Sequence, residues 1–184
     1  MVRLLFISIL LIATLVTSPL YGAVADHWIL VDVGAHTLAV YRGETLEQLY
    51  PRVAIGRSGA ANERRRGDGV TPTGEFHITR IDRASKFQIF MELDFPNEEH
   101  TERAYQHRLI DLDTYYSIRM ALRDGRLPPQ NTPLGGMIGI HGLGQAAADI
   151  HRSFDWTQGC VALTNSEIEQ LASWVRVGTR VVVR

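Results

Sequence analysis

The first part of the chain alternates apolar and polar positions over short runs, a pattern typical of β-strands that bury one face. Two β-prone runs, Trp28 to Val33 and Thr37 to Tyr41, flank a turn that contains Gly34 and predict a hairpin. Pro51 indicates a strand start or a sheet edge for the next run. The further strands predicted here cover residues 49–56, 75–81 and 87–93.

The pattern changes in the middle of the chain. From Asn97 to about Arg123 charged and aromatic residues mix without alternation, which predicts one or two helices that we expect to cover a cleft. A short strand is predicted at 137–142, a helix capped by Thr164 or Asn165 follows, and residues 179–184 predict a closing strand. The expected fold is therefore predominantly β with helical insertions, an α+β class.

The first 25 residues have the features of a secretory signal. Arg3 gives a small positive start, Leu4 to Thr17 are apolar and uncharged, and the small residues Ala23 and Ala25 fit a cleavage site. The apolar run is short for a membrane span, which needs about 20 residues. We expect cleavage after Ala25 and an exported mature chain, localised to the periplasm or cell envelope; an uncleaved anchor is the alternative.

Composition limits the possible classes of function. The chain has 184 residues, 45% of them hydrophobic. This length predicts a single domain, at residues 26–184, after the signal peptide at residues 1–25. A formal net charge of −1 gives no electrostatic reason to expect nucleic acid or anionic lipid as a partner. The basic run Arg64-Arg65-Arg66 is interpreted as part of a solvated loop; a contact with an anionic glycan or peptide is the weaker alternative.

The chain has one cysteine, Cys160, and an exported protein with a single thiol uses it as a reactive group, as a dimer link or as a buried apolar residue. His141, nineteen residues earlier, can serve as the base that a thiol nucleophile requires. Placed at the ends of adjacent strands, the two side chains can face each other across a cleft. Gly159 permits a tight turn, so that the backbone N–H groups of Gly159 and Cys160 can stabilise an oxyanion.

Three ordered segments resemble the L,D-transpeptidase (YkuD-type) catalytic domain family. His141-Gly142 is followed by fourteen residues and then by "TQGCV", Thr157 to Val161, with Asn165 beyond. Upstream, "GDGVTPTGEFHI" is similar to the segment G-D-x-x-T-P-x-G-x-[FY]-x-I of that family, and "VRVGTRVVV" is similar to its closing segment. The resemblance covers nearly the whole chain from about residue 28 to residue 183.

The resemblance implies a fold and a set of roles. It implies a mixed β-sandwich or barrel in which Cys160 is the nucleophile, His141 the general base and the Gly142 backbone the acceptor that orients the imidazole. It also implies that Gly159 and Cys160 form part of the oxyanion hole. Thr157, Gln158, Trp156 and Arg152 would line the substrate site. The family forms a thioester with the stem peptide of peptidoglycan, releases D-alanine and uses no metal or cofactor.

Two positions depart from the family pattern. Gln158 replaces a histidine, and Ala162 replaces an arginine that could hold a substrate carboxylate. Arg152 or His151 would have to supply that charge, although surface positions in a loop are the favoured interpretation of both. Trp156 is interpreted as a packing anchor of the turn or as a wall of the substrate groove.

The resemblance therefore implies a cysteine acyltransferase that cross-links or remodels the cell wall, with stem peptides as donor and acceptor. An L,D-carboxypeptidase, or a hydrolase of existing links, is the first alternative, and a non-catalytic wall-binding domain is the second. A thiol paired with His141 would react with iodoacetamide well below pH 8.5, roughly the value of a free thiol. That reactivity separates the enzymes from the binding domain, whereas the sequence contains no signal for the oligomeric state.

Overall fold

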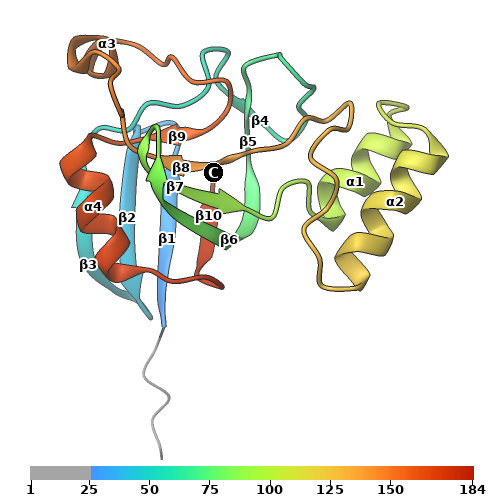
Figure 1. Ribbon diagram of the computed structural model, residues 1–184, viewed down its shortest axis with the longest axis horizontal. Coiled ribbons are helices and arrows are strands. Elements are labelled where there is room, and N and C mark those ends of the chain that lie inside the picture. The colour runs from blue at the N-terminus through green and yellow to red at the C-terminus, as the bar shows by residue number, and fades with distance from the viewer. Residues whose placement is uncertain (1–25) are drawn as a thin grey trace, which may run out of the picture.

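The computed structural model describes residues 26–184, and the signal peptide predicted for residues 1–25 lies outside the described part. Figure 1 shows a twisted sheet with one helix packed on it and a pair of helices to one side. Eight strands form this sheet in the order β3-β2-β1-β10-β6-β7-β8-β9. The fold predicted from the sequence, predominantly β with helical insertions, is confirmed.

The N-terminal strands form one half of the sheet. β1 (His27–Asp32), β2 (Thr37–Arg42) and β3 (Thr45–Tyr50) are an antiparallel meander. The closing strand β10 (Arg180–Val183) lies parallel to β1, so the last residues of the chain hydrogen-bond beside the first described ones. Alternate apolar residues of these strands, such as Ile29, Val31 and Val181, are fully buried, as the period of a half-buried strand requires.

The other half of the sheet contains the candidate chemistry. β6 (Gly74–Ser85) is long enough to pair with β10 at one end and with β7 (Gln88–Leu93) at the other. β7 pairs with β8 (Gly139–His141), and β8 pairs in parallel with β9 (Val161–Ala162). A separate parallel pair, β4 (Ala60–Ala61) and β5 (Thr71–Pro72), closes the base of the loop between them.

The helix α4 (Asn165–Trp174) covers one face of the sheet (Figure 1). Thr164 caps it in a capping box with Glu167, whose carboxylate accepts a hydrogen bond from the Thr164 backbone. Ile168 and Leu171 are fully buried against the sheet. Each such side chain contributes about 1.5–3 kcal/mol of hydrophobic stabilisation, so this face holds the helix in place.

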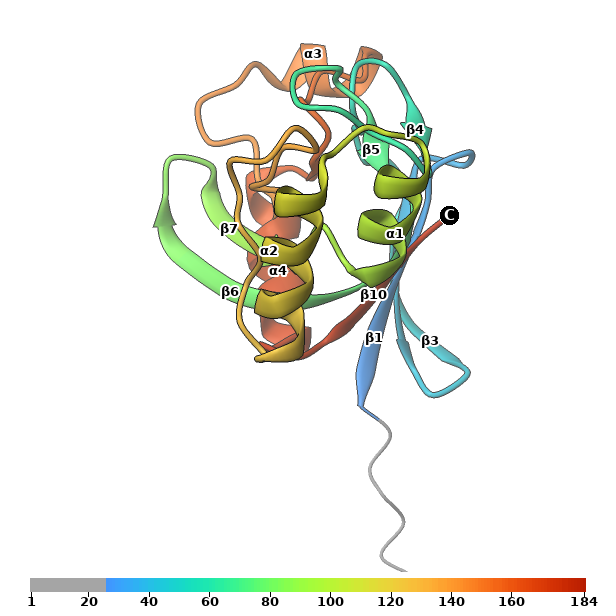
Figure 2. The ribbon, with the colours of Figure 1, turned by 90° about the vertical axis from the view of Figure 1, so that its right-hand side faces the viewer.

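Three further helices lie outside the sheet. α1 (Glu98–Gln106) and α2 (Leu112–Arg123) pack against each other at one side, capped by Asn97 and Asp111 (Figure 2). The middle of the chain thus forms two helices, one of the two possibilities that the sequence allowed. The short helix α3 (Ala148–Ser153) was not predicted, since six residues with no side-chain cap give little signal.

The strand expected at residues 49–56 is wrong. The chain turns at Gly43, which adopts a positive φ of 59°, and β3 already begins at Thr45. β3 lies at the edge of the sheet and is polar and partly exposed, so it lacks the apolar alternation that marks a strand in sequence. Residues 51–56 have only isolated bridges, between Ala54 and Ala162 and between Gly56 and Thr157.

Candidate active site

The parallel pair β8–β9 brings His141 and Cys160 together. His141 is the last residue of β8 and lies opposite Ala162 of β9, two residues after Cys160. Cys160 immediately precedes β9, so the strand pairing places it near His141, and both side chains line one cavity.

The backbone holds the imidazole of His141. Its Nδ1 lies 2.7 Å from the carbonyl oxygen of Gly142, which only accepts hydrogen bonds, so Nδ1 carries the proton and Nε2 is left as the basic atom. The imidazole stacks on the ring of Phe87, with 4.2 Å between the two ring centroids. It is T-shaped against Trp156, with 5.9 Å between the centroids. Burial lowers the pKa of His141, a shift that the Gly142 hydrogen bond opposes and the charge of His151 reinforces.

Asn165 fixes the loop that follows His141. Its Oδ1 accepts from the Gly144 N–H at 2.8 Å, and its Nδ2 donates to the Gly144 carbonyl at 2.9 Å. A Cβ at Gly142 would lie only 2.7 Å from the Phe87 carbonyl oxygen and 2.8 Å from a methyl group of Ile168. The residue that orients the imidazole is therefore held by close packing as well as by the Asn165 clamp.

The Cys160 thiol is placed to form a hydrogen bond inside the site. Its Sγ donates to the Met137 carbonyl oxygen at 3.4 Å. Burial raises the pKa of Cys160 to about 11, while the Gly139 backbone and the charge of Arg64 act in the lowering direction. This result departs from the sequence-based expectation of a thiol that reacts well below pH 8.5, roughly the value of a free thiol, so alkylation near neutral pH does not separate the enzymes from a binding domain. The thiol and the imidazole are both neutral at pH 7, which suits proton transfer to His141 during attack.

A short turn presents Cys160. Thr157 Oγ1 accepts from the Gly159 N–H at 3.1 Å and donates to the Cys160 carbonyl at 2.6 Å, while Gly159 adopts a φ of 120°. The Gly159 N–H, which the resemblance assigns to the oxyanion hole, donates to the Thr157 hydroxyl in this structure. Among residues 26–184, the Cys160 N–H has no hydrogen-bond partner, and it is the donor left for an oxyanion.

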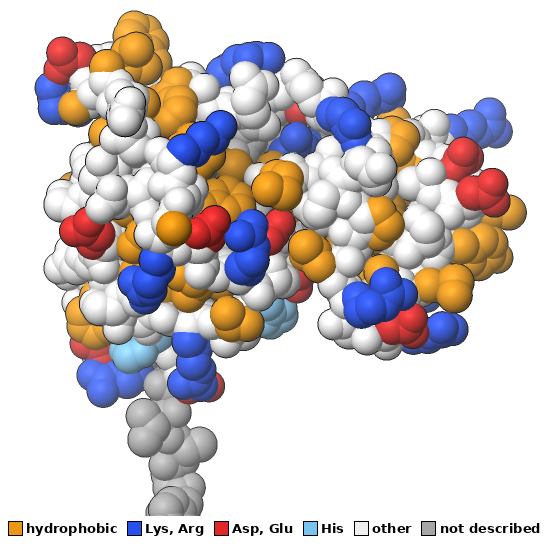
Figure 3. All heavy atoms as spheres, viewed as in Figure 1, with side chains coloured by type: hydrophobic (Ala, Val, Ile, Leu, Met, Phe, Trp, Pro, Cys, Tyr) orange, Lys and Arg blue, Asp and Glu red, His pale blue; other side chains and the backbone are white. Residues whose placement is uncertain are grey.

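The cavity that contains Cys160 and His141 has a volume of about 660 Å³. Figure 3 shows this hollowed part of the surface, with apolar side chains recessed and charged ones around them. Residues 85–90 at the β6–β7 turn form one wall and residues 136–138 another. No residue of α1 or α2 lines the cavity, so the expectation that the helical segment covers the cleft is wrong.

The other predicted site residues are divided between the cavity and the surface. Thr157, Gln158 and Trp156 line the cavity, with Thr157 buried and Gln158 exposed. Arg152 lies on α3, outside the cavity, and its exposed side chain pairs with Asp149. His151 is buried outside the cavity. Neither residue supplies the charge that Ala162 lacks.

Arg64 lines the cavity, although sequence reasoning placed it in a solvated loop. Its side chain is only 6% exposed, whereas those of Arg65 and Arg66 are exposed. The interpretation of the run as solvated is therefore wrong for its first member. The sequence signal that was available is the position of Arg64 shortly before "GDGVTPTG", the segment that resembles the family.

The described residues offer no metal site: no group of three or more His, Cys, Asp or Glu side chains in 26–184 is placed to hold an ion. Within the same residues, no helix has the length and apolar character that crossing a membrane requires. The chemistry available at the cavity is that of a thiol, an imidazole and backbone amides, with the charged side chains of Arg64, Arg80, Asp82 and Lys86 along its walls.

Comparison with protein families gives one match over nearly all the described residues. Residues 26–183 match the family model described as YkuD, the L,D-transpeptidase catalytic domain. No curated protein sequence matches the chain.

Solved structures share the fold at low sequence identity. The chain is similar to the helical cell shape determining protein Pgp2 from Campylobacter jejuni, with a TM-score of 0.54, 18% identity, and coverage of 88% of this chain and 49% of that one. Bd1075 from Bdellovibrio bacteriovorus gives a TM-score of 0.51 and 20% identity over 88% of this chain and 49% of the other. The Ldtfm–avibactam carbamoyl enzyme gives a TM-score of 0.50 and 15% identity, with coverage of 86% of this chain and 49% of the other.

These matches confirm the predicted fold, a mixed β-sheet with helical insertions that has the L,D-transpeptidase catalytic architecture. The chain spans about half the length of these solved structures.

Proposed function

Because the chain belongs to the L,D-transpeptidase catalytic domain family, we propose that it is an exported cysteine acyltransferase acting on peptidoglycan stem peptides. The observation that carries this proposal is the common cavity of Cys160 and His141, in which a backbone carbonyl fixes the tautomer of the imidazole. A nucleophile, a base and an orienting group are the parts that acyl transfer through a thioester requires.

The first half of the reaction is acylation. His141 Nε2 takes the proton of the Cys160 thiol while the sulfur attacks the carbonyl carbon that follows the L-centre of the diamino acid. The free N–H of Cys160 supports the proposal that this amide donates to the oxyanion of the tetrahedral intermediate. The C–N bond then breaks, the imidazolium returns its proton to the leaving amine, and D-alanine departs from a thioester on Cys160.

The second half transfers the acyl group. An acceptor amine, or water, loses a proton to His141 and attacks the thioester carbonyl, and the thiolate leaves and recovers that proton. An amine acceptor gives a cross-link, whereas water gives a tripeptide. The Gln158 side chain at the cavity is exposed and carries no titratable group, so His141 is the base in both halves.

The cellular setting follows from the proposed substrate. We infer that residues 1–25 direct export and that the domain from Asp26 works on the wall in the periplasm or envelope. The likeness to a helical cell shape determining protein supports a role in wall remodelling. Amino-terminal sequencing of the protein recovered from the envelope tests the export step, and a mature chain that begins at Asp26 is expected.

Trapping of the acyl-enzyme tests the chemistry. Residues 26–184 are incubated with a disaccharide-tetrapeptide muropeptide, quenched with acid and analysed as intact protein by mass spectrometry. We expect a mass increase equal to the muropeptide less D-alanine, and none in Cys160→Ala. An unmodified wild-type protein whose substrate is nevertheless consumed would contradict the thioester route.

A further inference from the structure

Arg64 occupies the position directly behind the nucleophile turn. A side chain at Gly159 would overlap the Arg64 Nη1 atom, and one at Gly135 would come within 3.2 Å of Nη2. The guanidinium is thus held between the turn that presents Cys160 and the loop whose Met137 carbonyl accepts the thiol proton. Both Arg64 and Cys160 line the same cavity.

The guanidinium is buried with little to satisfy it. In the described part of the chain, its Nε and Nη1 atoms are buried and have no hydrogen-bond partner. The guanidinium lies over the ring of Phe95, with its carbon 5.5 Å from the ring centroid. The carboxylate of Asp68, whose charge acts on Arg64, already accepts hydrogen bonds from the backbone N–H groups of Arg65 and Val70. A buried and unpaired cation destabilises a fold, so its presence calls for a functional reason.

We propose that Arg64 is the electrostatic residue of this site and that its fixed charge stabilises the Cys160 thiolate as the thiol proton passes to His141. The inference rests on the proposed role of Cys160 as nucleophile. Proton transfer leaves a negative sulfur and a positive imidazole in a site with little water. A nearby cation stabilises the negative sulfur.

The charge acts on the sulfur more than on the imidazole. Arg64 lowers the pKa of Cys160, whereas burial, the Gly142 carbonyl and His151 account for the pKa of His141. The remaining charged groups that line the cavity are Arg80, Asp82 and Lys86. Arg80 pairs with Glu92 and Asp82, so its charge is largely compensated.

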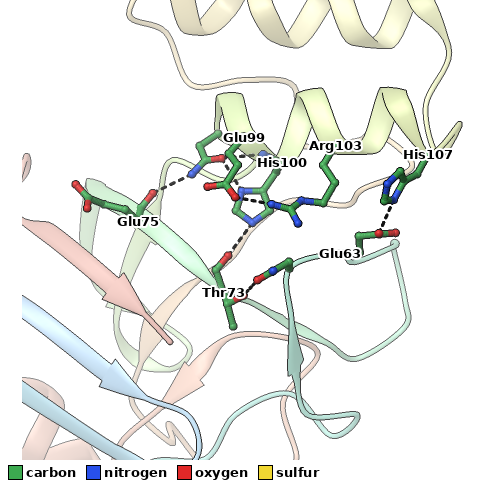
Figure 4. A network of polar contacts seen from close by, with 9 residues as sticks. Glu63, Thr73, Glu75, Glu99, His100, Arg103 and His107 are labelled. Carbon is green, nitrogen blue, oxygen red and sulfur yellow. Dashed lines mark hydrogen bonds and ion pairs between the residues drawn. The ribbon is translucent and has the colours of Figure 1, made fainter.

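Contacts from α1 and its C-cap residue hold the chain next to Arg64. Figure 4 shows two of them: the C-cap residue His107 pairs with Glu63 at 2.5 Å, and Nε2 of His100 in α1 lies 3.0 Å from the Thr73 carbonyl oxygen. The Thr73 hydroxyl in turn donates to Asn62. These contacts fix residues 62–63 immediately before Arg64. α1, against which α2 packs, therefore supports the active site from behind, although neither helix lines it.

Thiol reactivity tests the proposal without any peptidoglycan substrate. The second-order rate of iodoacetamide alkylation at about pH 8 is compared for wild type, Arg64→Met, Arg64→Lys and Arg64→Gln. Below its pKa a thiol reacts in proportion to its thiolate fraction, so loss of the charge is expected to slow Arg64→Met and Arg64→Gln by about tenfold. Arg64→Lys keeps the charge and is expected to stay within about threefold of wild type.

The control is the neighbouring, exposed arginine. Arg65→Gln removes the same charge from a side chain outside the cavity and is expected to leave the rate unchanged. Because Arg64→Met removes an unpaired buried cation, its melting temperature should equal or exceed that of wild type.

Two results would overturn the proposal: a folded Arg64→Met or Arg64→Gln protein that reacts at the wild-type rate, or an equal slowing in Arg64→Lys accompanied by a lower melting temperature. The second result would mark Arg64 as a packing residue. A protein with the expected alkylation rates but no Cys160-dependent product from muropeptides would refute the proposed function and leave this electrostatic role standing.

Discussion

The Nδ1 atom of His141 lies 2.7 Å from the carbonyl oxygen of Gly142, the next residue in the chain. A backbone carbonyl keeps the imidazole in one tautomer without bringing a negative charge to it. No carboxylate is therefore available at this contact to raise the pKa of the base, and burial lowers it instead. The candidate base is neutral over a wide pH range.

The first prediction concerns the acidic limb of the pH–rate profile. His141 must be neutral to accept the thiol proton, and its pKa is lowered from 6.5, so it stays neutral to lower pH than an exposed histidine. The acidic limb of kcat/KM is therefore expected to have its midpoint below pH 6.5, the ordinary pKa of a histidine. The rate of muropeptide turnover between about pH 4 and 8 measures it. A limb centred above that ordinary value would contradict a buried, neutral base.

The second prediction concerns the thiol in the absence of substrate. Because burial raises the pKa of Cys160 to about 11, alkylation by iodoacetamide is expected to be slow at neutral pH and to rise through the alkaline range. The rate is measured as loss of free thiol at several pH values, with Cys160→Ala as the blank. A plateau reached already near pH 7 would show a preformed thiolate and would refute the protonated thiol described above.

The third prediction concerns Gly159, whose φ of 120° and contact with Arg64 leave no room for a side chain. Gly159→Ala is expected to abolish turnover and to lower stability by more than the roughly 1–2 kcal/mol that a left-handed backbone costs a residue other than glycine. Gly125→Ala is the matched control, since Gly125 also has a positive φ of 65° but open space around it. Denaturant unfolding and turnover compare the two. Equal losses in both variants would count against crowding at the nucleophile turn.

The fold could be predicted where apolar periodicity marks it and not elsewhere. The hairpin of β1 and β2, the capped helix α4 and the closing strand β10 all follow from burial patterns in their own residues. β3 was misplaced because an exposed edge strand has no apolar face to reveal it. The role of α1 and α2 was missed for a different reason: a helix that supports a loop from behind has the same sequence pattern as one that covers a cleft.

The sequence predicted only those site residues that lie in or beside a recognisable motif. The order of His141, Gly142 and Cys160 is a sequence motif, and Thr157 lies beside it. The sequence could not show that the Gly159 N–H is taken by the Thr157 hydroxyl, because that depends on the rotamer of one side chain. Arg64 and Met137 reach Cys160 from distant segments, and only tertiary contacts identify them.

The fourth prediction concerns the clamp between Asn165 and Gly144, which forms two hydrogen bonds. Asn165→Ala is expected to cost about 1–3 kcal/mol of stability, since it leaves the Gly144 amide and carbonyl without those partners. It should also lower kcat, because the loop that orients His141 loses its anchor. Gln170→Ala, on an exposed position of the same helix α4, is the control and should change neither quantity. An Asn165→Ala enzyme with wild-type kcat would show that Gly142 is held by packing alone.

The central claim is that Cys160 transfers acyl groups of peptidoglycan stem peptides, and product analysis tests it most directly. Residues 26–184 and the Cys160→Ala variant are incubated with a disaccharide-tetrapeptide muropeptide, and the products are identified by mass spectrometry. The account predicts a cross-linked dimer formed with loss of one D-alanine in the wild type only; tripeptide alone would assign the carboxypeptidase reaction. The absence of any Cys160-dependent product would contradict the account.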